Sequence, residues 1–334
     1  MSPATVSCSS AIPTGHQLAL VTLRGVVGTV VRDVTDIDHP VTRCTLDGGS
    51  SFRFRDETNV SYIALPVDAG LGAPGSLYLV NLQTRTTSLV RSWTYGGFMS
   101  DLYNWSPDGS ELTYLTSDAV EVKWHLVSSS GDRTLSILGP VPGRGGRPDD
   151  DAMVGFSADG QYVAMVETFT TGSTSPFQVR RVADGSLVYS RADGTMATWL
   201  GSGATLYFRT SAAGMDWSPS AGLSSTSPVA WMHPRASPDG DRIVFTTVDP
   251  QGNDHPSVLS ATRGASPLVP GLRVGAAFIA SSFAWWAGEV PCPCGLGGPQ
   301  LTGLTYIYDF NSGAETASID TAFFDSWPHV VSQT

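Results

Sequence analysis

The sequence predicts an all-β fold: a β-propeller with seven blades of four antiparallel strands each, closed by the C-terminal strand. Turn-forming residues are frequent, with 36 glycines and 22 prolines among 334 residues, while hydrophobic residues make up 41%. This composition suits a folded core broken by many turns and does not suit a disordered chain or a helical bundle. A hairpin sequence also recurs about every 45 residues, the length of a four-stranded propeller blade. A six-bladed ring is the alternative.

The recurring hairpin is the most specific of these observations. Three segments align without gaps, Asn104–Thr116, Gly155–Glu167 and Arg235–Thr247; each carries Ser, Pro or Ala, Asp and Gly before a β-branched and aromatic run. Proline fixes φ, the aspartate side chain bonds the turn backbone, and glycine supplies a positive φ. The residues to which we assign a structural role in these turns are Pro107, Asp108, Gly109, Asp159, Gly160, Pro238, Asp239 and Gly240.

Weaker copies extend the repeat along the chain. A degenerate copy spans Trp199–Thr210, and turn positions near Gly15, Asn59 and Ala284 complete the count of seven. Runs typical of a third strand follow several of these turns. They are Leu77–Thr84, Val122–Ser128, Phe177–Val182 and Leu304–Phe310.

The ring is predicted to close through the C-terminus. The first unit begins with its second strand, His16–Thr22, so its innermost strand must come from elsewhere, and Ala322–Trp327 is the candidate. Such closure removes two open sheet edges. We expect residues 1–14 to form a flexible N-terminus and residues 15–331 a single propeller domain.

The Ser-Pro-Asp-Gly cores at 106–109 and 237–240, with the near match Ser157–Gly160, make the sequence resemble the TolB-like, WD40-like propeller family with its PD40 repeats. The resemblance covers roughly residues 15–330 and implies a propeller that interacts with proteins. Two departures stand out: the N-terminal α/β domain of TolB is absent, and seven units replace its six blades. The Trp-Asp dipeptides of WD40 repeats and the Asp-box of sialidases are absent as well.

Charge and hydropathy exclude two classes of partner. The formal net charge is −11, and Arg144 and Arg147 run directly into Asp149, Asp150 and Asp151, so the sequence offers no basic stripe for nucleic acid. No apolar run of about 18 residues exists, so no transmembrane segment is expected. The chain carries no signal-peptide pattern. We expect a monomer.

The four cysteines bear on the compartment. Cys8, Cys44, Cys292 and Cys294 allow three disulfide connectivities. Disulfide bonding of some kind is favoured over free thiols and over a metal site, because a zinc site needs two more ligands with suitable spacing. An even cysteine count in such a chain favours an oxidising setting, which means a periplasmic, cell-envelope or secreted protein.

The distribution of loop lengths indicates a binding face. First-to-second and third-to-fourth turns are short, whereas second-to-third loops and blade crossings are long, as in Gly139–Asp151 and Thr168–Pro176. Insertions gathered on one face of a repeat protein often mark the binding face; unconstrained drift is the alternative. The candidate binding residues, each of which also fits a solvated or packed role, are Asp101, Asp149, Asp150, Asp151, His233, Trp93 and Trp217.

Catalytic interpretations find less support. No Gly-x-Ser-x-Gly elbow and no α/β-hydrolase half is present. Paired carboxylates for glycan cleavage stay open, because a single sequence does not reveal distances across a channel. The acidic segments Asp33–Asp38 and Asp249–Asp254 match no EF-hand loop, so Ca²⁺ is only a weak expectation and no other cofactor is expected.

We therefore expect a non-catalytic binding or scaffold module that takes a protein or peptide partner on its long-loop face. The alternative is a polysaccharide lyase or hydrolase-type enzyme with its active site at the channel mouth.

Overall fold

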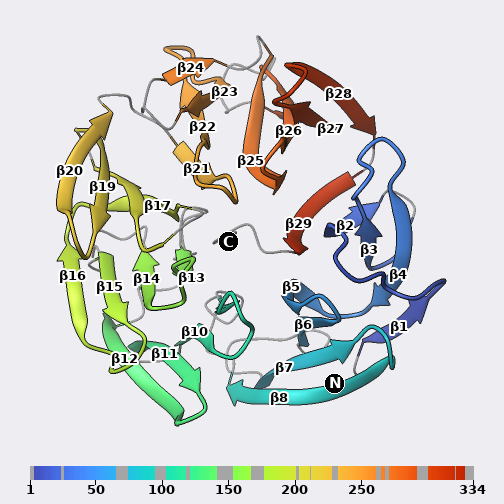
Figure 1. Ribbon diagram of the computed structural model, residues 1–334, viewed down its shortest axis with the longest axis horizontal. Helices are drawn as coiled ribbons and strands as arrows, with labels where there is room; N and C mark the ends of the chain where they lie inside the picture. Colours follow the sequence, from blue (N-terminus) through green and yellow to red (C-terminus); the bar gives the residue numbers. More distant parts are fainter. Residues whose placement is uncertain are drawn as a thin grey trace.

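Short antiparallel strands build the described part of the computed structural model, and their sheets stand as seven blades around a central axis (Figure 1). The structure describes residues 4–23, 26–64, 74–94, 103–117, 121–140, 153–166, 177–200, 203–210, 212–227, 232–260, 265–267, 271–291, 300–319 and 321–327. Within these ranges every regular element is a strand. The seven-bladed prediction is confirmed, and the six-bladed alternative falls away.

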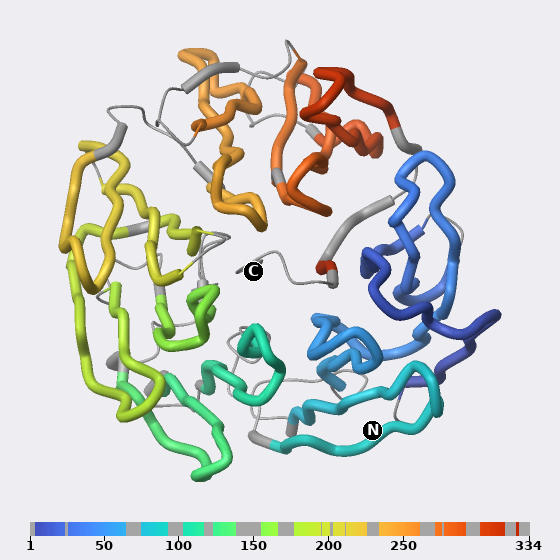
Figure 2. Tube along the Cα trace, viewed as in Figure 1, coloured from blue at the N-terminus to red at the C-terminus, as the bar shows by residue number. Residues whose placement is uncertain are grey.

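Six blades contain four antiparallel strands, and blade 1 contains these four and a fifth, outer strand. We number the blades in chain order (Figure 2). Blade 1 holds β1 (Thr5–Cys8), β2 (Leu18–Leu23), β3 (Thr29–Asp33), β4 (Val41–Asp47) and β29 (Thr321–Trp327); blade 2 holds β5 (Ser50–Asp56), β6 (Asn59–Ala64), β7 (Pro74–Asn81) and β8 (Thr86–Thr94); blade 3 holds β9 (Tyr103–Trp105), β10 (Leu112–Ser117), β11 (Glu121–Ser128) and β12 (Gly131–Pro140). Blade 4 holds β13 (Met153–Phe156), β14 (Tyr162–Val166), β15 (Phe177–Arg181) and β16 (Leu187–Arg191); blade 5 holds β17 (Thr195–Trp199), β18 (Leu206–Arg209), β19 (Gly214–Ser218) and β20 (Gly222–Ser227). Blade 6 holds β21 (Met232–Ala236), β22 (Ile243–Val248), β23 (Asp254–Leu259) and β24 (Ala265–Pro267); blade 7 holds β25 (Arg273–Ala280), β26 (Phe283–Val290), β27 (Gln300–Asp309) and β28 (Ala314–Ile319).

The ring closes as the sequence predicts. Strand β29 pairs antiparallel with β2, with Leu18 opposite Trp327 and Leu23 opposite Thr321. The last strand of the chain thereby becomes the innermost strand of blade 1 (Figure 1). Asp325 of β29 also accepts a hydrogen bond at 2.7 Å from the backbone N–H of Phe54 in blade 2, so the closing strand is tied to both neighbours.

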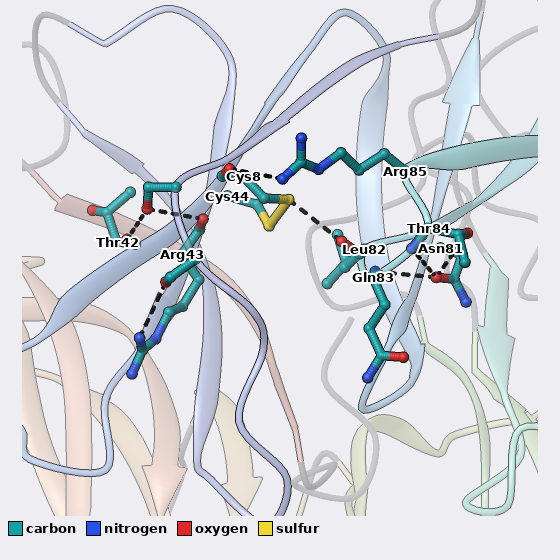
Figure 3. The surroundings of a disulfide bond; sticks show 11 residues. Cys8, Thr42, Arg43, Cys44, Asn81, Leu82, Gln83, Thr84 and Arg85 are labelled. Atoms are coloured by element: carbon teal, nitrogen blue, oxygen red, sulfur yellow. Dashed lines mark hydrogen bonds between the residues drawn. A yellow bond between two sulfur atoms is a disulfide. The ribbon is translucent and has the colours of Figure 1, made fainter.

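The N-terminus differs from the expectation of a flexible tail over residues 1–14. Residues Thr5–Cys8 form β1, which pairs with β4 as a fifth, outer strand of blade 1. A disulfide joins Cys8 to Cys44, and the Cys8 sulfur lies 3.5 Å from the Leu82 carbonyl of blade 2 (Figure 3). An open edge strand offers unpaired backbone groups, and here the N-terminal segment pairs with them. Cys292 and Cys294 lie outside the described residues.

The core lies between the blades. Side chains alternate across each strand, so that Leu18 and Leu20 pack towards blade 2 whereas Ala19 and Val21 pack towards blade 7. The largest fully buried side chains, Trp124, Trp199 and Trp286 among them, fill these layers. Each sheet is therefore covered on both faces, which explains the low share of charged residues.

The three repeated turns share one geometry. In the first of them Ser106 donates to Asp108 at 2.6 Å, the Ser110 N–H donates to Asp108 at 3.0 Å, and the Gly109 N–H donates to the Ser106 carbonyl at 2.8 Å. The turns at Asp159–Gly160 and Asp239–Gly240 repeat these bonds. All three glycines have φ between 68° and 76°. Aspartate therefore holds each turn and glycine allows its backbone angle.

Candidate functional site

A cleft of about 670 Å³ lies between blade 1 and blade 7, next to the ring closure. These blades, blue and orange to red in Figure 1, come from opposite ends of the chain. The cleft walls are mainly apolar, with Val21, Leu23, Val34 and Ile37 on blade 1 and Ile279, Phe283, Trp285 and Ile307 on blade 7.

The size of the side chains explains why this cleft is open. Between blades 4 and 5, Phe177 contacts Phe208 and Tyr189 stacks on Trp217, with ring centroids 4.9 Å and 5.0 Å apart. At the cleft, by contrast, the wall of blade 1 is made of aliphatic, small and charged side chains, and the facing strand β28 contributes small residues. The aromatic side chains of the cleft, Phe283 and Trp285, come from blade 7 alone, so no aromatic ring of blade 1 meets them, and space is left that paired rings fill between blades 4 and 5. The small residues at the cleft are Ala19, Pro40, Ala314 and Ala317.

Among the residues that the structure describes, Arg32 is the one cationic side chain in the cleft lining. It lies on β3 and is partly buried; its Nη2 donates a long hydrogen bond of 3.4 Å to the Pro40 carbonyl, and its buried Nε has no hydrogen-bond partner. Burial lowers the pKa of the Arg32 guanidinium. No ion pair joins it to a carboxylate of the described residues.

Two carboxylates also line the cleft, Asp38 and Asp309. Asp309 accepts hydrogen bonds from the Ser312 hydroxyl at 2.7 Å and from the Asn311 N–H at 2.8 Å, and these bonds lower the pKa of Asp309. Its charge is thus used in the turn between β27 and β28. Asp38 is exposed in the turn between β3 and β4. The cleft therefore combines apolar walls with one cation and two anions.

A second concentration of polar groups lies between blades 2 and 3. His125 Nε2 is 2.9 Å from the Thr116 hydroxyl, and His125 Nδ1 is 3.5 Å from Asp132. Asp132 also accepts from the Tyr114 hydroxyl at 3.0 Å and pairs with Arg91. The His125 ring stacks on Tyr114 with centroids 4.7 Å apart, and burial lowers the pKa of His125. The group links two blades; burial favours the neutral imidazole, whereas the Asp132 carboxylate opposes this shift in the pKa of His125.

The structure tests the predicted aromatic candidates only in part. Trp217 lies in β19, is 5% exposed and packs in the core between blades 4 and 5, so of its two interpretations the packed role holds and the surface binding role does not. Trp93 lies in β8 opposite Gly75. Nothing is described of its side chain.

The remaining predicted residues stay predictions. Asp101, Asp149, Asp150 and Asp151 lie outside the described residues. His233 lies within β21, and its side chain is not described. The enzyme alternative depends on such residues and is untested. Most of the long loops, on which the predicted binding face rests, also fall outside the described ranges.

The two acidic segments considered for Ca²⁺ use their carboxylates internally. Asp33 is 5% exposed; burial opposes its ionisation, but hydrogen bonds from Arg43 at 2.6 Å and His16 at 2.7 Å hold its pKa well below the ordinary value. Asp249 accepts from Asn253 and Gln251 in its own turn. Among the residues that the structure describes, no group of three or more His, Cys, Asp or Glu side chains could hold a metal.

Sequence reasoning missed the cleft, although one signal was present. Val30 and Arg32 of β3, and Val34 directly after its end, alternate on the side that faces blade 7. A charged residue on the inward face of a strand between two buried valines is unusual.

In the described part of the chain, no helix is long and apolar enough to cross a membrane.

Comparisons with solved structures agree with this architecture. A prolyl endopeptidase matches with a TM-score of 0.60 at 11% identity, over 96% of this chain and 50% of that one. The periplasmic gluconolactonase PpgL of Pseudomonas aeruginosa matches with a TM-score of 0.55 at 12% identity, over 92% and 99%. The chain is a seven-bladed β-propeller.

TolB from Acinetobacter baumannii also matches, with a TM-score of 0.47 at 17% identity, over 74% of this chain and 61% of that one. The chain therefore spans less than two thirds of both TolB and the prolyl endopeptidase. The propeller fold expected from the resemblance to TolB-like proteins is confirmed by the seven sheets of the structure itself. No protein-family model matches the sequence, and no curated protein matches it.

Proposed function

We propose that this propeller is a non-catalytic binding module and that a peptide segment of its partner occupies the cleft between blades 1 and 7. The observation that carries the proposal is the cleft itself. Its volume of about 670 Å³ falls within the range of ligand pockets, and its lining follows their usual pattern of apolar walls with a few polar groups. Pockets of this kind hold a chain by burying its apolar side chains.

An exported or envelope setting is part of the proposal. The Cys8–Cys44 disulfide supports it, because such bonds form and persist in oxidising compartments. One of the structurally similar proteins, PpgL, is a periplasmic gluconolactonase. Fractionation of cells that produce the full natural protein tests this point, and a reduced protein in the cytoplasm would contradict it.

The long-loop face stays a second proposed contact surface, with Asp149, Asp150 and Asp151 as its charged group. If it carries the partner, replacing all three aspartates by lysine should abolish capture of that partner. Binding that is unchanged after this charge reversal would remove the acidic group from the proposal.

The cleft is tested with a mixture of N-acetylated tetrapeptides randomised over Leu, Ile, Val and Phe. Wild-type protein should retain peptides on size exclusion, detected by mass spectrometry. The variant Ala314→Phe places a ring at the cleft wall and should retain none. Ser225→Phe is the matched control, because Ser225 is also exposed on the outer strand of its blade. Failure of the wild type to retain any peptide, or equal retention by Ala314→Phe, would refute the proposal.

A further inference from the structure

The charge in the cleft indicates the chemistry of its ligand. We propose that the cleft recognises the free C-terminal carboxylate of an apolar peptide and that Arg32 binds this carboxylate. The inference rests on the proposed function, in which a peptide occupies the cleft, and adds which end of the peptide is bound and by which residue.

Arg32 lies where it can meet a ligand in the cleft. It projects from β3 towards blade 7, in line with Val30 and Val34, and lines a cleft whose other walls are mainly aliphatic and aromatic. Its Nε is buried without a hydrogen-bond partner, and its only described bond is the 3.4 Å contact with the Pro40 carbonyl. A guanidinium has five N–H donors. The Nε–H is enclosed by protein, but no described hydrogen bond uses Nη1, so the donors at the tip of the Arg32 side chain are left for a ligand.

A partly buried guanidinium without a carboxylate partner is energetically unfavourable. Burying a charge is unfavourable unless the charge is paired and hydrogen-bonded. Two other partly buried arginines are paired in this way: Arg43 with Asp33 at 2.6 Å and Arg273 with Glu315 at 2.8 Å. Arg180, which also has a pKa lowered by burial, instead donates to the Gln178 side chain and the Gly185 carbonyl. Arg32 lacks a carboxylate partner, and a planar guanidinium matches the two oxygens of a carboxylate. A ligand carboxylate would therefore supply the missing counter-charge.

The two acidic side chains of the cleft favour a carboxylate over a more highly charged anion as the ligand of Arg32. Asp38 and Asp309 line the same cleft and would repel a phosphate dianion. A single carboxylate carries one charge, which Arg32 alone can balance. The apolar walls require that the rest of the ligand be apolar.

The hydroxyl groups on the blade 7 wall favour a peptide over a fatty acid as the ligand. Ser312 and Thr316 line the blade 7 wall. The Ser312 hydroxyl donates to Asp309 and accepts from the Ala314 N–H at 3.3 Å, which leaves one of its oxygen lone pairs for an incoming N–H. Peptide N–H groups need such acceptors when water is removed. An alkyl chain has no group to bond there.

The test compares two forms of the same peptides. N-acetylated tetrapeptides of Leu, Ile, Val and Phe are prepared with a free C-terminal carboxylate and as C-terminal amides, and their binding is measured by titration calorimetry. The carboxylate form should bind about tenfold to a hundredfold more tightly, the usual worth of a charge-assisted hydrogen bond. Arg32→Gln should reduce binding of the carboxylate form to that of the amide and leave the amide unchanged.

Two further variants control this comparison. Arg32→Lys keeps the charge but loses the two-pronged geometry, so its preference for the carboxylate should be intermediate. Arg181→Gln removes an exposed arginine from blade 4, far along the chain from the cleft, and should change nothing. Thermal melting of each variant establishes that it is folded.

The outcomes are distinct. Equal binding of the two forms, blocked by Ala314→Phe but unaffected by Arg32→Gln, would overturn the carboxylate inference and leave the proposed function intact. Decanoate that binds as tightly as the peptide acid, with the same dependence on Arg32, would overturn the choice of a peptide. Absence of binding by both peptide forms would refute the proposed function, and the inference with it.

Discussion

Replacing Gly109 by alanine should destabilise the protein more than the same replacement at Gly160, although both glycines occupy the same place in the repeated turn. Both have φ of 68°, so both variants incur the cost of a left-handed backbone for a residue with a Cβ. That cost is about 1–2 kcal/mol. The two positions differ in what the new methyl group meets.

At Gly109 a Cβ would lie 2.6 Å from the carbonyl oxygen of Arg55 in blade 2, whereas at Gly160 the nearest atom is Pro107 Cδ at 3.9 Å. The first contact is a clash with backbone and cannot be relieved by rotating a side chain. Arg55 Nε also donates to the Gly109 carbonyl at 2.8 Å, and its guanidinium lies over the Trp105 ring at 5.2 Å. Overpacking of this kind costs about 1–3 kcal/mol.

We therefore expect Gly109→Ala to lower the free energy of unfolding by about 2–5 kcal/mol and Gly160→Ala by about 1–2 kcal/mol. Urea unfolding followed by tryptophan fluorescence measures both values under the same conditions. Equal losses, or a larger loss at Gly160, would show that the turn of blade 3 does not dock on blade 2 as described.

Three further predictions concern other parts of the ring. The Cys8–Cys44 disulfide closes a loop with a sequence separation of 36, so the double variant Cys8→Ser, Cys44→Ser should lose up to about 4 kcal/mol of unfolding free energy. Reduced wild-type protein should melt at the same temperature as this variant. A variant that melts like the oxidised wild type would contradict the stabilising role of β1. Burial lowers the folded-state pKa of His125, so the unfolded chain takes up a proton first, and stability should fall as the pH drops from about 6.5 towards the folded pKa. The urea midpoint should therefore fall less between pH 7.5 and pH 5 in His125→Gln than in the wild type. Equal slopes of midpoint against pH in the two proteins would assign the effect to other groups. Asp184, whose pKa is lowered to about 2 mainly by the Ser186 hydroxyl, titrates below this pH range. Ending the chain at Ile319 removes β29 and exposes the edge of β2, which should lower the melting temperature sharply, and a truncated protein that melts like the full chain would argue against closure by this strand.

Much of the fold was predictable because its information is local. Each Ser-Pro-Asp-Gly turn contains its own acceptor, its own fixed φ and its own glycine, so the hairpins are encoded within a few residues. Three such turns and four weaker turn positions give the blade count, and the missing first strand of the first unit implies the closing strand. Neither step requires knowledge of how distant side chains pack.

The errors arise where pairing or packing is non-local. Strand β1 is short and rich in serine and threonine, and it is ordered only because the outer edge of β4 and Cys44 are beside it. Trp217 is followed by Ser218 and Pro219, which is typical of a loop, yet stacking on Tyr189 of the preceding blade places it in the core. In both cases the partner lies in another strand, far from the residue along the chain.

The sequence alone determined the repeating unit, the number of blades and the closing strand, because turn chemistry and strand periodicity act over a few residues. Only the tertiary structure decided that a cleft remains between blades 1 and 7 and that Arg32 lines it without a carboxylate partner. The volume left between two sheets depends on which side chains meet across the closure. Those side chains come from the two ends of the chain, and only the closed ring brings them together.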